Sequence, residues 1–215
     1  MVGDVLRHGA EPAAAKALCV FVHGRGQTPE EMVDQVIRHF PQDVAFALAH
    51  ANGKSCYAAR AVHPLTDATR SELAWSFAHL RRLIEGLRDA TLLPMLLARF
   101  SQGACLTLEL ACTGQVLPDA LAALTGCRVG TATHARPSAL PRALPVYLTG
   151  GDADPWIPLT AFAEAAADLG RQGAAVRADL FPGRAHEVSR PELAMLSAIL
   201  SDLSSGRPPR LAAAR

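Results

Sequence analysis

The sequence lacks an excess of charge of either sign. It has 21 Lys and Arg residues against 20 Asp and Glu, for a formal net charge of +1. Proteins that bind nucleic acid or anionic membranes through their overall field carry a marked basic excess. Neither kind of partner is therefore expected, and small molecules are the predicted ligands.

Long apolar runs and paired cysteines are also missing. No apolar run near the amino terminus is long enough to span a bilayer, and acidic Asp4 and Glu11 stand where a secretory signal would be basic. We expect a cytoplasmic protein. The chain has five cysteines, an odd number with no CxxC pair and no metal-ligand spacing, so we expect reduced thiols and no metal site.

What the sequence does have is enough apolar material for one substantial core. Its 215 residues are 50% hydrophobic, and they contain no internal repeat and no long linker. We predict one domain over residues 1–205. The tail over residues 206–215 has too little apolar surface to dock and is expected to fray.

Short apolar runs alternate with amphipathic stretches, which predicts an α/β fold with a mostly parallel central sheet flanked by helices. Strands are predicted over residues 18–22, 44–49, 95–100, 121–124, 146–149 and 176–181, and helices over residues 29–39, 69–88, 102–113, 159–172 and 191–203.

Two loops after predicted strands have the residues of a nucleophile and its oxyanion site. Ser101 lies in the sequence RFSQG, which resembles the strand-to-helix turn Gly-x-Ser-x-Gly with Arg99 at the first glycine. The backbone N–H of Gln102 would then face a developing oxyanion, and Arg25 in HGRGQ would supply a second N–H. The alternatives are a helix-capping serine and a plain glycine-rich turn, although no GK[ST] follows to make a phosphate loop.

Two further loops offer a base and a carboxylate. GDADPWIP contains Asp152 and Asp154, and PGRAHEV contains His186. Either aspartate could orient a histidine, or both could be turn residues. The carboxyl ends of parallel strands share one edge of a sheet, and the order Ser101, Asp154, His186 is that of α/β-hydrolases.

The blocks HGRGQ, FSQGA, GDADPWIP and PGRAHEV resemble the phospholipase/carboxylesterase family of α/β-hydrolases, over about residues 18–203. The resemblance implies an α/β-hydrolase fold without a large cap domain, and no cofactor. It implies a catalytic triad of Ser101, Asp154 and His186, with oxyanion N–H groups from Arg25 and Gln102. It also allows a homodimer. His23, Tyr57 and Trp156 are the candidates for lining the substrate pocket.

Three positions depart from the family pattern. Arg99 replaces a glycine, Ala185 replaces a glycine, and Cys56 replaces the tryptophan of a Ser-Trp-Tyr segment within ANGKSCYAARAVHPL. Losing a large ring at Cys56 either reshapes the substrate side or is neutral. We expect the serine turn to form with the Arg99 side chain directed to a carboxylate or to solvent, because an unpaired buried guanidinium is costly.

These features predict a serine carboxylesterase that hydrolyses small, soluble, short-acyl esters or thioesters through an acyl-enzyme. No apolar insertion suited to a lid lies between residues 49 and 69. The alternatives are a catalytically weakened or non-catalytic ligand-binding protein on the same scaffold, and an acyl transferase or peptidase that uses the same triad.

Overall fold

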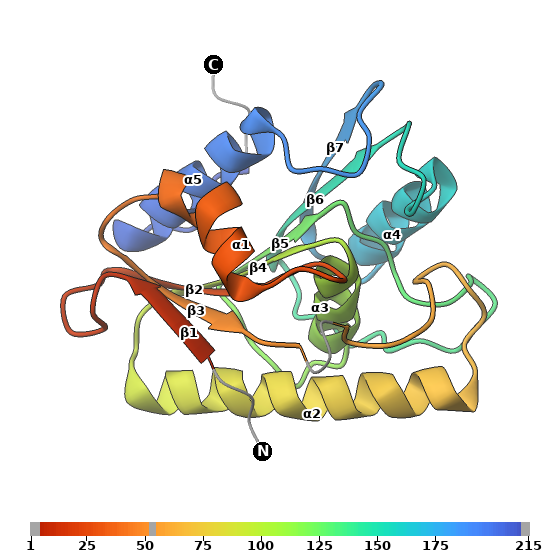
Figure 1. The fold of residues 1–215 in the computed structure, drawn as a ribbon, viewed down its shortest axis with the longest axis horizontal. Helices are drawn as coiled ribbons and strands as arrows, with labels where there is room; N and C mark the ends of the chain where they lie inside the picture. Colours follow the sequence, from red (N-terminus) through yellow and green to blue (C-terminus); the bar gives the residue numbers. More distant parts are fainter. Residues whose placement is uncertain (1–4, 52–54, 212–215) are drawn as a thin grey trace.

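The computed structural model describes residues 5–51 and 55–211, and a seven-stranded sheet forms its centre (Figure 1). The strand order is β1-β3-β2-β4-β5-β6-β7, with every pairing parallel except the antiparallel one between β1 and β3. The strands are β1 (Val5–Gly9), β2 (Ala17–Val22), β3 (Val44–Ala49), β4 (Met95–Phe100), β5 (Ala120–Leu124), β6 (Pro145–Gly151) and β7 (Ala175–Phe181). The predicted mostly parallel sheet is confirmed.

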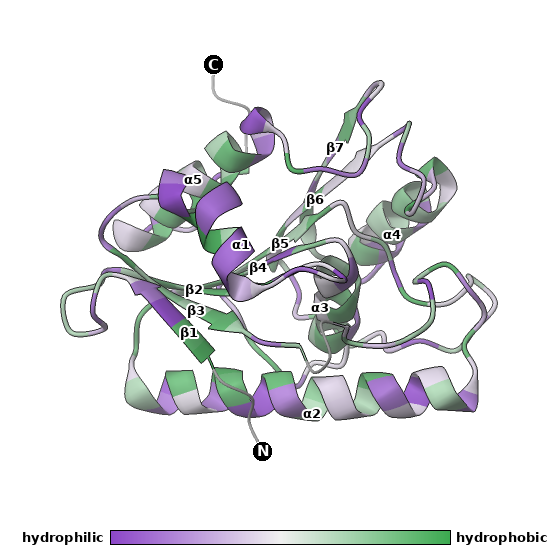
Figure 2. Cartoon of the chain, viewed as in Figure 1, coloured by the Kyte–Doolittle hydropathy of each residue, from purple (hydrophilic) through white to green (hydrophobic). Residues whose placement is uncertain are grey.

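Helices cover both faces of this sheet. They are α1 (Pro29–Gln35), α2 (Asp67–Ala90), α3 (Gln102–Cys112), α4 (Leu159–Arg171) and α5 (Arg190–Ser204), with a short 3-10 turn, η1, at Ile37–His39. Apolar side chains of α1 and α5 pack with one face of the sheet, and those of α2, α3 and α4 pack with the other. In Figure 2 the central strands are mainly green and α1 is mainly purple, as expected for a buried sheet under an amphipathic layer. None of the described helices is both long and apolar enough to cross a membrane.

Three local features differ from the predictions. Strand β1 was not predicted, because it is a half-exposed edge strand with only two apolar residues at its start. The first helix ends at Gln35, before the 3-10 turn, rather than at residue 39. The expected fraying does not apply to residues 206–211, because Asp202 accepts from the Arg210 N–H at 2.9 Å and Leu211 accepts from Arg177 at 3.2 Å. The rest of that tail lies outside the described residues.

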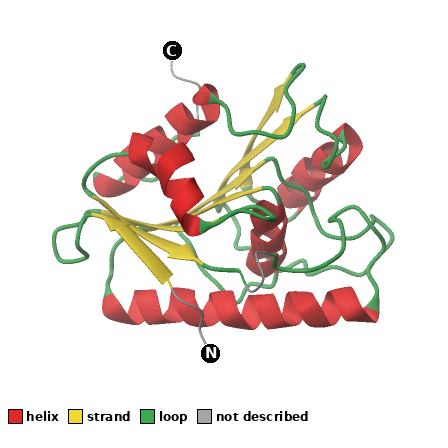
Figure 3. Ribbon diagram, viewed as in Figure 1, coloured by secondary structure: helices red, strands yellow, loops and turns green. Residues whose placement is uncertain are grey.

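The loops with the predicted site residues lie at one edge of the sheet, because the strands that precede them are parallel. Loops are green in Figure 3. Those with the predicted site residues follow strands β2, β4, β6 and β7. Strands β2, β3, β4 and β5 are buried along their whole length, so the loop that follows each starts from a rigid base.

Candidate active site

Ser101 occupies a strained turn between β4 and α3. Its backbone has φ 56° and ψ −123°, a conformation that non-glycine residues rarely adopt. The turn is fixed on both sides, because the Ser101 N–H donates to Leu124 O at 3.0 Å and its carbonyl accepts from Cys105 N at 3.0 Å. A glycine is needed two residues further on, because a Cβ at Gly103 would lie 2.8 Å from the carbonyl oxygens of Val22 and His23. The serine is therefore held on a sharp elbow rather than acting as a side-chain cap of α3, since it makes no capping hydrogen bond.

His186 and Asp154 reach Ser101 in sequence. The His186 Nε2 atom lies 2.7 Å from Ser101 Oγ, and its Nδ1 atom lies 2.8 Å from Asp154 Oδ2. Asp154 is fixed by two N–H groups, from Trp156 at 2.7 Å and Ile157 at 3.0 Å, both to Oδ1. A carboxylate held in this way fixes the histidine tautomer with the proton on Nδ1, which leaves Nε2 to accept the serine proton.

The side chains of both predicted oxyanion residues form hydrogen bonds with one segment, residues 55–59. The Arg25 guanidinium donates to the carbonyls of Tyr57 and Ala58 at 2.9 and 2.8 Å, and also to that of Ala59. The Gln102 side chain donates to Tyr57 O at 2.7 Å and accepts from Cys56 N at 2.9 Å. Gln102 is also the first residue of α3, where a backbone N–H has no partner within its helix. Sequence reasoning used only the N–H groups of these two residues and missed their side chains.

His23 does not line the substrate pocket, contrary to the prediction. Its ring is buried, with Nδ1 2.8 Å from Gly24 O and Nε2 accepting from Ala51 N at 3.1 Å. These contacts need a neutral ring with its proton on Nδ1. Burial lowers the pKa of His23 below its usual range, which favours that form. His23 therefore fixes the loop after β2 to the chain just beyond β3.

A cavity of about 350 Å³ opens at Ser101, and Tyr57 and Trp156 both line it. Its other lining residues are Arg25, Arg60, Ala61, Gln102, Cys105, Ile157 and His186. Arg60 lies over the Trp156 ring, 4.8 Å from its centroid, and donates to Pro155 O at 2.6 Å. Among the described residues no group of three His, Cys, Asp or Glu side chains could hold a metal ion.

Arg99 differs from the sequence prediction in where its side chain ends, and not in whether the serine turn forms. It fits beside the elbow because it lies in regular β4 pairing, opposite Val22 and Ala123, so its side chain leaves the sheet towards the helices and not into the turn. It reaches neither a carboxylate nor solvent: it is 0% exposed, and none of its three guanidinium nitrogens has a hydrogen-bond partner in the described part of the chain. Burial lowers the pKa of Arg99 to about 9.

Cys56 does not reshape the substrate pocket either. It lines the small cavity that contains Arg99 and is absent from the lining of the Ser101 cavity. The segment containing Cys56 begins at Ala51, and residues 52–54 of it lie outside the described residues.

Sequence analysis missed the buried charges that hold the His186 loop. Arg184 donates to Glu192, to Thr125 Oγ1 at 3.0 Å and to Glu187 O at 2.8 Å, and Glu192 is fully buried. The only signal was Ser189-x-x-Glu192, a capping-box pattern that reads as a helix start. Asp152, the other aspartate of its loop, accepts from Gly183 N at 2.6 Å and so ties the aspartate loop to the histidine loop.

Comparisons with known proteins identify the family and the fold of the chain. A sequence model of the phospholipase/carboxylesterase family matches residues 76–204. A phospholipase/carboxylesterase from Dyadobacter fermentans is 24% identical, with a TM-score of 0.82 over 93% of this chain and 96% of that one. Esterase PE8 is 23% identical, with a TM-score of 0.71 over 94% and 98% of the two chains. A carboxylesterase from Mesorhizobium loti is 16% identical, with a TM-score of 0.71 over 87% and 89%.

No curated protein matches the sequence. The likeness to the solved structures extends over nearly the whole chain and shows that the α/β-hydrolase fold is shared. The family match covers more than half of the chain and includes the elbow, the aspartate loop and the histidine loop. The chain belongs to the phospholipase/carboxylesterase family of α/β-hydrolases.

Proposed function

We propose that this protein is a serine carboxylesterase that hydrolyses small, short-acyl esters or thioesters through an acyl-enzyme. The observation that carries the proposal is the chain of two short contacts from Ser101 Oγ to His186 and on to Asp154. A serine hydroxyl is a weak nucleophile without such a base. The strained φ of Ser101 supports the same role, because it raises the hydroxyl towards the cavity at a conformational cost that a capping serine would not need.

In the proposed mechanism, Ser101 Oγ attacks the acyl carbon as its proton passes to His186 Nε2. Asp154 keeps the imidazole in the required tautomer and stabilises its charged form. The N–H groups of Arg25 and Gln102 stabilise the negative oxygen of the tetrahedral intermediate. His186 then gives the proton to the departing alcohol or thiol. A water molecule attacks the acyl-enzyme by the same sequence of steps and releases the acid.

The size of the cavity favours small substrates. About 350 Å³ is near the lower limit of small-molecule sites, and Tyr57, Ile157 and Trp156 form its apolar walls. We expect kcat/KM for p-nitrophenyl esters to be highest for the acetate and butyrate and to fall for octanoate and laurate. A steady rise with acyl length would contradict the proposed substrate class without touching the triad.

The triad is tested with a fluorophosphonate probe and p-nitrophenyl acetate. Wild type should be labelled at Ser101, and Ser101→Ala should lose labelling and about 10⁶-fold in kcat. Asp154→Asn should lose about 10⁴-fold, because the wrong tautomer is then stabilised. Ser201→Ala, an exposed serine on α5, is the matched control and should behave as wild type. A folded wild type that neither reacts with the probe nor hydrolyses any ester would refute the proposal in favour of a binding protein.

A further inference from the structure

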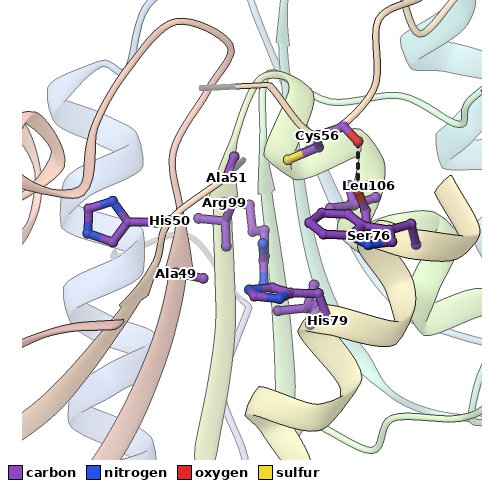
Figure 4. A pocket seen from close by; sticks show the side chains of 11 residues that line it. Ala49, His50, Ala51, Cys56, Ser76, His79, Arg99 and Leu106 are labelled. Carbon is purple, nitrogen blue, oxygen red and sulfur yellow. Dashed lines mark hydrogen bonds between the residues drawn. The ribbon is translucent and has the colours of Figure 1, made fainter. Parts of the chain in front are cut away.

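A second cavity lies behind the elbow, between the sheet and helix α2. Its charged residue, Arg99, does not line the Ser101 cavity. It has a volume of about 30 Å³, which is room for about two water-sized molecules. Val22, Ala49 and Arg99 line it from the sheet, and Ser76 and His79 line it from α2. Figure 4 shows the Arg99 side chain pointing from β4 towards His79.

Two side chains of this cavity have buried nitrogen atoms without partners. All three guanidinium nitrogens of Arg99 and the Nε2 atom of His79 are shielded from solvent and make no hydrogen bond within residues 5–51 and 55–211. Arginine has only donors to offer, and it stays charged at neutral pH even though burial lowers its pKa to about 9. Among the described residues, the cavity therefore contains a positive charge without a counter-charge and guanidinium donors without an acceptor.

The neighbouring polar groups are occupied elsewhere. Ser76 Oγ donates to Cys56 O at 2.6 Å, as the dashed line in Figure 4 shows, and the Cys56 N–H donates to Gln102. Burial raises the pKa of the Cys56 thiol to about 11, so it remains neutral and supplies no counter-charge. His50 also lines the cavity, and Val22, Leu80 and Leu106 are among its apolar walls.

We propose that this cavity binds a planar oxyanion of the size of formate through the Arg99 guanidinium, with His79 Nε2 as a second donor. Water could accept some of these hydrogen bonds, but it would leave the buried charge uncompensated. A guanidinium presents its N–H groups in a planar fork that matches the two oxygens of a carboxylate. The volume excludes phosphorylated metabolites and longer acids.

Two departures from the family pattern meet at this site. Arg99 stands where the family has glycine, and Cys56, where it has tryptophan, lines the same cavity. A glycine at 99 would bring no charge, and a large ring at 56 would occupy space that the cavity now has. The pair therefore supplies both the charge and the room that an anion requires.

Access is through α2. Trp75 lines the cavity and is 52% exposed, and its ring stacks on that of His79 with centroids 5.7 Å apart. A movement of these two side chains, without any change in the sheet, would open a path from solvent. Trp75 therefore also reports on occupancy through its fluorescence.

The test measures thermal unfolding in sodium gluconate, an anion too large for the cavity, as it is replaced by sodium formate at constant ionic strength. Wild type should gain about 5–10 °C in Tm at a hundredfold excess over Kd, and above Kd the gain should rise with the logarithm of the formate concentration. Arg99→Met should not respond, and in gluconate it should be at least as stable as wild type, because it removes an unpaired charge. Arg70→Met, which changes an exposed arginine on α2, is the control and should respond as wild type. In Trp156→Phe protein, where Trp75 is the remaining tryptophan, its fluorescence should change with formate concentration and level off above Kd.

Two results would overturn the proposal. One is an equal response of wild type and Arg99→Met to formate, which would make the effect a general salt effect. The other is an Arg99→Met protein that is clearly less stable than wild type in gluconate, which would mean that Arg99 already has a compensating partner. Neither result bears on the esterase proposal, because no residue of that triad is changed.

Discussion

Replacing Gly151 by alanine should damage catalysis by pressing on the histidine loop. A Cβ at Gly151 would lie 2.2 Å from the carbonyl oxygen of Arg184 and 3.0 Å from its carbon. Contacts of a Cβ below 3.0 Å are essentially never seen, and both atoms of this clash belong to the backbone, so the two loops must separate by about 0.8 Å. Arg184 is two residues before His186, and Gly151 is three residues before Asp154. The displacement therefore falls on the hydrogen bond between the proposed base and its carboxylate.

A displacement of about 1 Å in a catalytic group can lower the rate about 100-fold. We expect Gly151→Ala to lose about 100-fold in kcat for p-nitrophenyl acetate, with KM little changed, because Gly151 does not line the substrate cavity. The pre-steady-state burst should slow by the same factor, since acylation needs the base. Circular dichroism and Tm establish that the variant is folded.

Gly170→Ala is the matched control. Gly170 lies in α4 with nothing within 4 Å of its added Cβ, so the variant should keep wild-type kcat and gain up to about 1 kcal/mol in stability. A folded Gly151→Ala protein with wild-type kcat would refute the reasoning, because it would mean that the site tolerates this shift.

Three further predictions concern stability. Glu192→Gln should lower the free energy of unfolding in urea by about 3–5 kcal/mol, because it leaves the buried Arg184 charge without its partner; a loss below about 1 kcal/mol would contradict this. In His23→Gln, stability should fall less than in wild type as pH drops below about 6.5. The folded-state pKa of His23 is lowered, so the unfolded chain binds the proton more readily and wild type loses stability as the ring protonates; parallel pH profiles would argue against this. Thr107→Val should raise stability by about 1 kcal/mol in the same assay, because the Thr107 hydroxyl is buried and has no partner among the described residues; a destabilised variant would reveal one.

Much of the fold could be predicted because local patterns are strong. The buried parallel strands are continuous apolar runs, and α1 begins at Thr28 with a capping box followed by Pro29, both visible in the sequence. Strand β1 could not be predicted, because its pairing with β3 is a long-range contact that leaves no periodic signal in five half-exposed residues. The end of the predicted first helix was also wrong, since the chain tightens into a 3-10 turn after Gln35.

The candidate site divides in the same way. The candidate triad could be predicted from its residue types and their order, because Ser101, Asp154 and His186 each follow an apolar strand. The role of a side chain that positions another residue could not be predicted. His23 turned inward to fix a loop, Cys56 turned away from the substrate cavity, and Arg184 paired with a glutamate from α5. Each of these orientations depends on which element packs against the residue, and the sequence does not encode that locally.

The sequence by itself determined the class of fold, the family and the candidate nucleophile, because alternating apolar runs and loop motifs are local properties of the chain. Only the tertiary structure decided how well the serine is held and where Arg99 goes. The elbow forms with arginine beside it, because the side chain leaves β4 on the face towards α2. There it lies buried and without a partner in the described part of the chain, since the space at that face is set by residues from β2, β3, α2 and α3 that meet only when the chain is folded.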